Sequence, residues 1–136
     1  MVYLDSNVFV YAVTHDPAKN SKARSAIRVL REVEENTVHG VTSLLTWDEI
    51  GWVVWKLKGP DAGVATAAAF MKLRNLSLST VNLAVMLRAQ ELIERYRGLK
   101  PRDSIHVATA LLAGEREIIS DDSDLDVVRV IKRVGL

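Results

Sequence analysis

The sequence predicts an α/β protein in which a mostly parallel central sheet of four to five strands lies between helices on both faces. Short apolar runs, several of them β-branched, alternate along the chain with longer segments in which apolar residues recur at helical spacing. Helices therefore separate the strands, which is the βαβ pattern of parallel sheets. The chain has 136 residues and no repeats or linkers, so we expect a single domain spanning residues 1–136.

The first half of the chain is predicted to supply two strands and four helices. The first apolar run ends at Asp5, after which Ser6 or Asn7 can cap a helix. The longer segments carry apolar residues three and four positions apart, as amphipathic helices do. In chain order the expected elements are strand, helix, helix, strand, helix and helix, over Val2–Leu4, Ser6 to about Val13, Lys22–Glu35, Val38–Thr42, Leu44–Lys58 and Asp61–Leu73.

The second half is predicted to supply three strands and two helices. Asn82 can cap the first of these helices, and Gly98 follows its end in the usual C-cap pattern. Pro101 opens the second helix, where a missing N–H costs little. In chain order the expected elements are strand, helix, helix, strand and terminal strand, over Leu76–Val81, Asn82 to about Tyr96, Pro101 to about Ala113, Glu117–Ser120 and Val127–Val134.

The composition is typical of a globular protein from a reducing compartment. Hydrophobic residues make up 49% of the chain and charged residues 26%. No apolar run approaches the roughly 18 residues that cross a bilayer, and the N-terminus lacks the basic and apolar regions of a signal peptide. The absence of cysteine excludes disulfides and thiolate metal sites. We therefore expect a cytoplasmic protein with no membrane association.

Four acidic residues flank the predicted strands at one edge of the sheet. Asp5 ends the first strand, and Asp122 lies just beyond the fourth. Asp103 lies in the first turn of a helix, where free amides and the helix dipole favour a carboxylate. Glu49 lies one turn inside the helix that follows the second strand. Because ligands of open parallel sheets bind beyond the carboxyl ends of the strands, we expect these four side chains to converge there.

Converging carboxylates call for a cation. They repel one another, and with little water present some of them would have to protonate. A hard divalent ion removes this conflict, and Mg²⁺ prefers oxygen ligands while keeping several waters. Two such ions about 3.5–4 Å apart can activate a water and stabilise the leaving oxygen of a phosphodiester. Without cysteine or paired histidines, the chain gives no support for zinc.

Each acid also has an ordinary structural explanation. Asp5 can be a helix N-cap, and Asp103 can simply stabilise a helix dipole. Asp48 competes with Glu49, because helical periodicity does not decide between these neighbours. The acidic run 120–126 can be a solvated turn. Basic residues nearby can steer a polyanion or form ordinary solvated helix faces. Taken one at a time, these signals do not identify a site.

Four segments in a fixed order are more specific than any single acid. They are Asp5-Ser6-Asn7 after the first strand, Ser43 six residues before Glu49, Arg102–Ala110, and Ile118–Leu125. This series resembles the PIN-domain family, and most of all its short single-domain members that act as VapC-type toxins. The resemblance covers nearly the whole chain. It implies a three-layer α/β/α fold and an endoribonuclease that requires Mg²⁺ or Mn²⁺.

The resemblance also assigns roles to individual residues. It implies a set of acids that hold the metal and serve catalysis, namely Asp5, Glu49, Asp103 and Asp122. The spacing from Ser43 selects Glu49 over Asp48. Asn7 and Ser120 would orient the carboxylates from behind, and Asp124 matches an additional, less uniform acid of the family. The implied reaction is hydrolysis of single-stranded or structured RNA by a metal-activated water, with no protein nucleophile.

Partners follow from the same resemblance. Small PIN proteins commonly form homodimers, and toxins of this class bind an antitoxin that covers the acidic cleft. Trp47, Trp52 and Trp55 are expected to serve core packing or a homodimer contact rather than base stacking. His106, three residues after Asp103, is expected to be a packed helix residue.

Other functions stay open at this point. A free-standing PIN nuclease of RNA processing or decay would carry the same acids. A catalytically inactive nucleic-acid-binding or scaffold domain usually lacks one or more of them, and all are present here. A strand that ends in aspartate also occurs in enzymes that form an aspartyl-phosphate. However, Asn7 stands where haloacid dehalogenase-like phosphatases have a second aspartate, and the acidic pair and lysine of response-regulator receivers are absent.

Overall fold

A five-stranded sheet forms the centre of the computed structural model, which describes residues 1–136. The strands are β1 (Val2–Leu4), β2 (Gly40–Ser43), β3 (Leu76–Ser79), β4 (Glu117–Ile119) and β5 (Lys132–Val134). Their order across the sheet is β3-β2-β1-β4-β5, and every neighbouring pair is parallel. The predicted α/β class with a parallel central sheet is confirmed.

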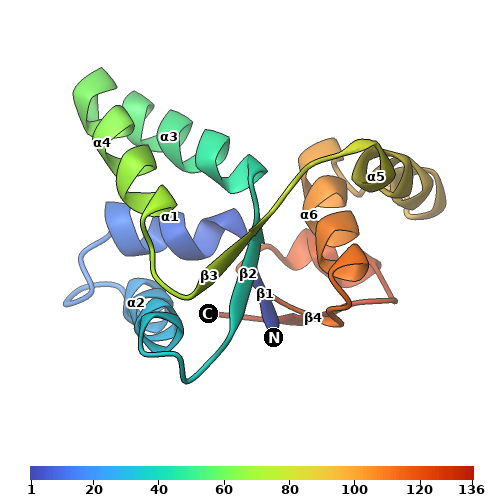
Figure 1. Cartoon of the computed structure of the whole chain (residues 1–136), viewed down its shortest axis with the longest axis horizontal. Helices are drawn as coiled ribbons and strands as arrows, with labels where there is room; N and C mark the ends of the chain where they lie inside the picture. The colour runs from blue at the N-terminus through green and yellow to red at the C-terminus, as the bar shows by residue number, and fades with distance from the viewer.

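Six α-helices cover the two faces of the sheet. They are α1 (Ser6–Thr14), α2 (Ser21–Glu34), α3 (Leu45–Lys58), α4 (Pro60–Met71), α5 (Leu83–Arg95) and α6 (Pro101–Leu112). Figure 1 shows α1 to α4 on one side of the sheet and α5 and α6 on the other. This division follows from the strand order. The chain moves outward from β1 to β3 and then crosses to β4 on the far side of β1, which sends the last helices to the opposite face.

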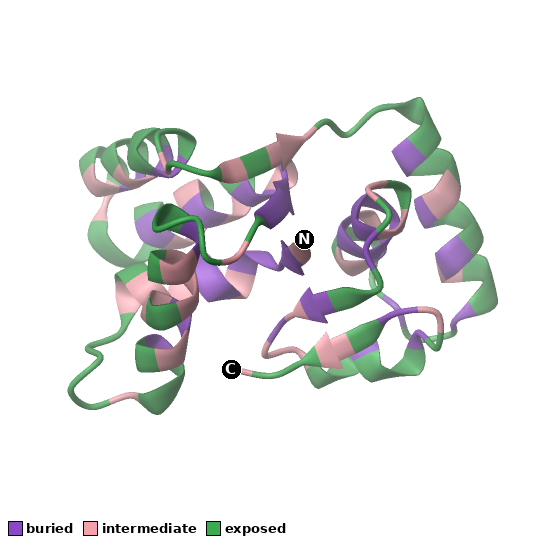
Figure 2. Cartoon of the chain, turned by 60° about the horizontal axis from the view of Figure 1, so that its bottom comes forward, coloured by how far each residue is buried: buried purple, intermediate pink, exposed green.

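Consecutive residues of β1 belong to two separate cores. Tyr3 lies in the cluster that packs against α5 and α6, whereas Leu4 lies in the cluster beneath α1 to α4. Both side chains are 0% exposed. Successive strand residues point to opposite faces, so a strand covered on both sides must be apolar throughout. Figure 2 shows the buried residues on the strands and on the helix faces turned toward them.

The C-terminal region departs from the prediction. The terminal strand was expected over Val127–Val134, but β5 is only Lys132–Val134. A short 3-10 helix, Ser123–Val127, occupies the acidic segment before it. Leu125 and Val128, both 1% exposed, lie three positions apart and reach the core from this turn. The β-branched composition therefore reflected burial rather than an extended backbone.

No helix has the length and apolar character needed to cross a membrane.

Candidate metal centre

The strand order reverses between β1 and β4, because the chain leaves β1 on one side of the sheet and β4 on the other. The carboxyl ends of two such strands are where open parallel sheets bind ligands, and we call this place the crevice. Asp5 follows β1 and Ser120 follows β4, and the backbone N–H of Asp5 donates to the carbonyl of Ile119 at 3.0 Å. Parallel pairing of β1 with β4 thus brings together two segments that are more than 100 residues apart.

Asp5 is a buried carboxylate surrounded by donors. Its side chain is an N-cap, because Oδ1 accepts a hydrogen bond from the backbone N–H of Ser6 at 2.7 Å. Oδ2 accepts from the Ser120 hydroxyl at 2.6 Å and from the Asn7 amide at 3.2 Å. The residue is 4% exposed. Capping and a place in the site are therefore compatible roles of one side chain, and the donors offset the cost of burying its charge.

Glu49 faces the same crevice from the first turns of α3. Its Oε2 accepts from the Ser6 hydroxyl at 3.0 Å, and its Oε1 lies 2.5 Å from Nε2 of His106. Burial alone would raise the pKa of Glu49, but the hydrogen bonds from His106 and Ser6, with the charge of Arg102, hold the pKa below its usual value. The side chain of Asp48 is 56% exposed and lies 4.0 Å from Arg102. These contacts support Glu49 rather than Asp48.

Asp103 is the acid that the protein satisfies least. It occupies the first turn of α6, and its Oδ2 is buried without a hydrogen-bond partner. Burial, together with the charges of Asp122 and Asp5, raises the pKa of Asp103 to about 6. Asp103 thus combines a buried oxygen without a partner with a pKa that burial raises more than either neighbouring charge does.

Asp122 is held at the start of the 3-10 helix by its backbone and by capping. Its N–H donates to Oγ of Ser120 at 3.0 Å, and its Oδ1 accepts from the N–H of Asp124 at 2.9 Å. Ser120 therefore connects the backbone of Asp122 to the carboxylate of Asp5. Asn7 completes this connection by donating to Ser120 at 3.0 Å. Asn7 and Ser120, predicted to orient the carboxylates, both contact Asp5.

Two other acids of this segment point elsewhere. Asp124 lies 3.3 Å from Nζ of Lys100, and its side chain is 54% exposed. Asp121 lies 2.7 Å from Lys22 and accepts from the Tyr11 hydroxyl at 2.9 Å. Asp121 thus fastens the segment to α1 and α2. Of the predicted acids, Asp5 and Glu49 are joined by shared contacts with Ser6 and His106, whereas no hydrogen bond connects Asp103 or the Asp122 carboxylate to them. A single site made of all four acids stays a prediction, and the side chain of Asp124 is engaged with Lys100.

The donor set fits a hard divalent cation. No group of three or more Asp, Glu or His side chains has the arrangement of a formed metal site. Even so, the crevice offers carboxylate oxygens from three elements of the fold, and one of these oxygens, Oδ2 of Asp103, is buried and unpartnered. An oxygen-only set of this kind suits Mg²⁺ or Mn²⁺ and not zinc. A cation would satisfy the unpaired oxygen and offset the burial and the acidic charges that raise the pKa of Asp103.

His106 contributes more to the site than the sequence indicated. It is buried, 1% exposed, as expected for a packed helix residue. Its ring nevertheless contacts Glu49 and, at 3.6 Å, Asp5, and its other nitrogen lies 2.7 Å from the Tyr3 hydroxyl. Burial lowers the pKa of His106, but the hydrogen bond to Glu49 and the surrounding carboxylates raise it above its ordinary value overall. The spacing of three residues from Asp103, on one face of α6, was the available signal.

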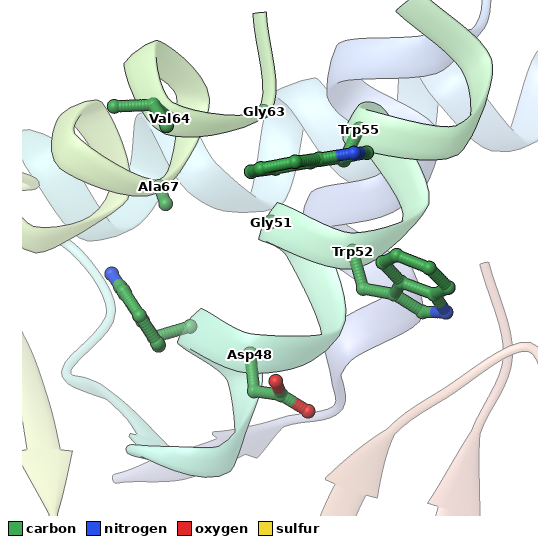
Figure 3. A pocket seen from close by; sticks show the side chains of 8 residues that line it. Asp48, Gly51, Trp52, Trp55, Gly63, Val64 and Ala67 are labelled. Carbon is green, nitrogen blue, oxygen red and sulfur yellow. The ribbon is translucent and has the colours of Figure 1, made fainter. Parts of the chain in front are cut away.

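The three tryptophans of α3 do not pack in the core. Trp47, Trp52 and Trp55 are 50%, 51% and 46% exposed, which excludes core packing and leaves the other predicted role, a homodimer contact, untested. They line an apolar groove of about 210 Å³ between α3 and α4, which we call the tryptophan groove (Figure 3). Gly63 permits the close approach of these helices, because a Cβ there would lie 2.9 Å from the carbonyl oxygen of Gly51. The three rings do not pack in the core and are accessible to a partner.

Comparison with known proteins agrees with the fold. The family model of the PIN domain matches residues 2–131. A comparison with curated protein sequences gave no match.

Solved structures with the same fold include several toxin proteins. VapC20 from Mycobacterium tuberculosis, described as a sarcin–ricin loop cleaving toxin, is 17% identical, with a TM-score of 0.77 and 95% of each chain covered. A chain of VapBC2 from Rickettsia felis, bound to a promoter DNA fragment, is 18% identical, with a TM-score of 0.72 over 99% of this chain and 98% of that one. A toxin–antitoxin complex from Klebsiella pneumoniae contains a chain that is 20% identical, with a TM-score of 0.68 over 96% and 95%. At these identities the likeness establishes the shared fold.

Proposed function

The chain belongs to the PIN-domain family, and from this membership and the acidic crevice we propose that it is a Mg²⁺- or Mn²⁺-dependent endoribonuclease, the toxin of a VapBC-type pair. The observation that carries the proposal is Oδ2 of Asp103, a buried carboxylate oxygen without a partner beside two further acids. The substrate is single-stranded or structured RNA. The solved neighbours that are toxins or toxin–antitoxin complexes support the toxin assignment.

The residues of the crevice divide the work of hydrolysis. When bound, divalent ions activate water and neutralise charge on the scissile phosphate. Asp5, Asp103 and Asp122 would hold a first ion, with Asp5 fixed in place by Ser120. Glu49, whose hydrogen bonds favour its ionised form, would help to hold a second ion or orient the water. No serine, cysteine or lysine nucleophile takes part.

Basic residues at the start of α6 attract the RNA backbone. Lys100 and Arg102 shortly precede Asp103 in the sequence, and their side chains are 68% and 61% exposed. Lys100 lies near Asp124, and Arg102 lies near Asp48. A phosphate of the RNA competes with the exposed acid of each pair for the positively charged side chain. Exchange of a weak surface ion pair for a phosphate contact costs little, which suits a substrate that must bind and leave.

Cleavage of RNA with and without a chelator tests the function. We expect cutting of a long single-stranded RNA with Mg²⁺ or Mn²⁺, none with EDTA, and recovery when Mn²⁺ is restored. Asp5→Asn and Asp122→Asn should each lower the cleavage rate by about a hundredfold or more, the scale of losing one group that stabilises the transition state.

Two neighbouring acids provide matched controls. Asp121→Asn removes the same charge one residue from Asp122, and Asp48→Asn removes a charge next to Glu49, but both side chains point away from the crevice. These variants should retain cleavage within a few-fold of the unaltered protein. Full activity in Asp5→Asn or Asp122→Asn would dismiss the site, and full activity in EDTA would dismiss the metal.

Two protein partners are proposed together with the toxin function. An antitoxin needs an exposed apolar surface to bind, and the tryptophan groove offers one. A homodimer needs a second such surface, and Leu83, Met86 and Leu87 of α5, which are 73%, 44% and 59% exposed, supply it. Sedimentation of the protein alone and with its antitoxin, for Trp52→Glu and Leu87→Glu, would assign the surfaces: each variant should lose one association and keep the other.

The toxin and a free-standing nuclease of RNA processing or decay are distinguished in the cell. Induced expression of the chain should arrest growth, and Asp5→Asn should not. Relief of the arrest by the product of an adjacent small gene would identify the antitoxin. An active ribonuclease whose expression leaves growth unaffected would favour the role in processing or decay. A metal-binding chain without cleavage would favour an inactive RNA-binding or scaffold domain.

A further inference from the structure

Two donors lie between the carboxylates of Glu49 and Asp5, which come from different elements of the fold. Oγ of Ser6 is 3.0 Å from Oε2 of Glu49 and 3.5 Å from Oδ1 of Asp5. Nε2 of His106 is 2.5 Å from Oε1 of Glu49 and 3.6 Å from the same Asp5 oxygen. Two carboxylates that share the same donors repel each other, and a donor placed between them offsets the repulsion. The protein thus holds this pair of acids by direct contacts.

Tyr3 holds the ring of His106 from the opposite side. The Tyr3 hydroxyl lies 2.7 Å from Nδ1 of His106 and accepts a hydrogen bond from the backbone N–H of Ser43 at 3.1 Å. Tyr3 and His106 are 0% and 1% exposed, so neither can exchange these partners for water. A continuous chain of contacts therefore runs from the end of β2, through Tyr3 and His106, to Glu49.

The hydrogen-bond partners of His106 decide which ring nitrogen carries its proton. Nε2 faces only carboxylate oxygens, from Glu49 and Asp5, so it must carry a proton to make a favourable contact. The Tyr3 hydroxyl already accepts from Ser43 and has its own proton free to donate to Nδ1. Among the neutral forms of the ring, Tyr3 selects the one that donates to Glu49. In the protonated ring Nε2 still carries its proton toward Glu49.

We propose that Tyr3 and His106 are positioning residues that hold the carboxylate of Glu49 beside Asp5 in the geometry that metal binding requires. The proposal rests on the proposed function, because it concerns the same metal site. It adds residues that touch neither the metal nor the RNA. One turn of α6 supplies both Asp103 and His106, so the helix that delivers an acid also delivers the donor that orients another.

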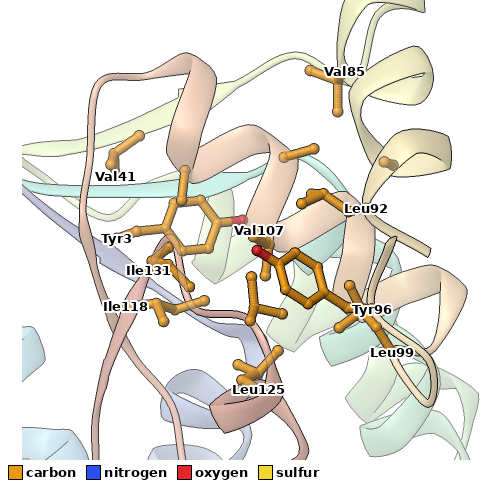
Figure 4. Close-up of a cluster of buried hydrophobic side chains, with 14 residues drawn as sticks. Tyr3, Val41, Val85, Leu92, Tyr96, Leu99, Val107, Ile118, Leu125 and Ile131 are labelled. Carbon is orange, nitrogen blue, oxygen red and sulfur yellow. The ribbon is translucent and has the colours of Figure 1, made fainter. Parts of the chain in front are cut away.

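Four single substitutions test the proposal. His106→Leu removes the donor, and His106→Gln restores an amide N–H of similar reach. Tyr3→Phe removes the hydroxyl that holds the ring and keeps the aromatic volume. Tyr96→Phe is the matched control, because Tyr96 belongs to the same buried cluster as Tyr3 (Figure 4) and its hydroxyl makes no hydrogen bond to Tyr3, His106 or the acids. Mn²⁺ affinity by calorimetry, kcat and KM for RNA, and the ¹⁵N shifts of His106 in the metal-free protein are the measurements.

His106→Leu should weaken Mn²⁺ binding by about tenfold or more, the usual scale for a residue that orients a metal ligand. His106→Gln should recover part of the loss, and Tyr3→Phe should weaken binding less than His106→Leu. The double variant Tyr3→Phe with His106→Leu should be no weaker than His106→Leu alone, because both act through one contact. The loss should appear in kcat more than in the KM for RNA. The ¹⁵N shifts should show a protonated Nε2, and Tyr96→Phe should match the unaltered protein.

The possible failures are distinguishable. Folded Tyr3→Phe and His106→Leu proteins with Mn²⁺ affinity within twofold of the unaltered protein would overturn the positioning role and leave the proposed function intact. An unprotonated Nε2 would overturn it as well. If His106→Leu does not fold, the comparison of Tyr3→Phe with Tyr96→Phe decides. An unaltered protein that neither binds Mn²⁺ nor cuts RNA would overturn the function and the positioning role together.

Discussion

The acidic crevice has two halves that the protein treats in opposite ways. Asp5 and Glu49 accept hydrogen bonds at every carboxylate oxygen, from Ser6, Ser120 and other donors. Across the crevice, Oδ2 of Asp103 is buried and accepts none. The pKa values diverge accordingly. Burial works against Glu49, yet its donors hold its pKa below the usual value, whereas burial and the nearby acids raise the pKa of Asp103 to about 6.

The acids that have hydrogen-bond donors and the acid that has none are expected to contribute differently to metal binding. A carboxylate that already has its donors is fixed in position before any ion arrives, which favours a defined geometry. A carboxylate without donors is unfavourable in the empty protein and gains the most from a cation. The half around Asp5 therefore sets the shape of the site, and the half around Asp103 supplies much of the drive to fill it.

Divalent ions should produce the largest effect on stability. At an Mn²⁺ concentration one hundred times its dissociation constant, the free energy of unfolding should rise by about 2.7 kcal/mol. Asp103→Asn should lose most of this gain, because the oxygen with no other partner is gone. Asp121→Asn, whose side chain is paired with Lys22, should keep it. Urea unfolding with and without Mn²⁺ measures the gain, and an equal gain in Asp103→Asn would remove the distinction between the two halves.

Asp5→Asn should destabilise the metal-free protein by about 2 kcal/mol, since a buried acceptor becomes a donor facing other donors. An asparagine can still cap α1 through its oxygen, but its amide group then meets the Ser120 hydroxyl and the Asn7 amide. Chemical unfolding in EDTA at pH 7 measures the loss. An unchanged or higher stability would mean that Asp5 carries the same strain as Asp103, and the two halves would then be alike.

Much of this arrangement could be predicted from the sequence, and the limits have physical reasons. Asp5 and Asp122 were predicted because the carboxyl ends of parallel strands meet at one edge, so the fold places the segments that follow β1 and β4 there. Glu49 needed the spacing from Ser43, because one helical turn does not distinguish it from Asp48. The contact of Glu49 with His106 joins residues 57 positions apart and depends on how α3 and α6 pack, which periodicity does not fix.

One prediction and one excluded alternative have a common origin. The terminal strand over Val127–Val134, and core packing as one of two roles for the tryptophans, were both inferred from residue type. Apolar and β-branched residues favour burial without specifying the backbone, and Val128 is buried from a turn. Aromatic residues also serve surfaces that bind partners, and Trp52 remains half exposed. Residue type alone distinguishes neither case.

Asp103→Asn should stabilise the metal-free protein, the opposite sign to Asp5→Asn. A shift from 3.8 to about 6 corresponds to roughly 3 kcal/mol in full, and partial exposure to solvent reduces this to about 1 kcal/mol. The gain should depend on pH. Well below the ordinary pKa of 3.8 the folded and unfolded forms both hold the proton, so Asp103 adds no penalty. As the pH rises toward 6 the unfolded chain loses its proton first, and stability declines.

The effect of Asp103 on the pH dependence is measured as the difference between the unfolding free energies of the unaltered protein and Asp103→Asn. Glu49 contributes in the opposite sense, because its lowered pKa gives stability that is lost as the pH falls. Subtracting the unfolding free energy of Asp103→Asn from that of the unaltered protein at each pH removes this shared contribution. The difference should be close to zero well below the ordinary pKa of 3.8 and should favour the variant above pH 6. A flat difference over this range would show that Asp103 is not strained.

Asp124→Asn should have the smallest effect and marks the boundary of the site. The side chains of Asp124 and Lys100 are 54% and 68% exposed and lie 3.3 Å apart, and an exposed pair of this kind contributes about 0.5 kcal/mol or less to stability. Its backbone N–H, which caps Asp122, is unaffected by the substitution. Mn²⁺ affinity should therefore stay within a few-fold, measured beside Asp122→Asn, whose affinity should collapse. An equal loss in both variants would place Asp124 among the metal ligands. The half of the crevice without hydrogen-bond donors would then extend to its rim, and Lys100 would be the residue that pairs with Asp124 in the metal-free protein.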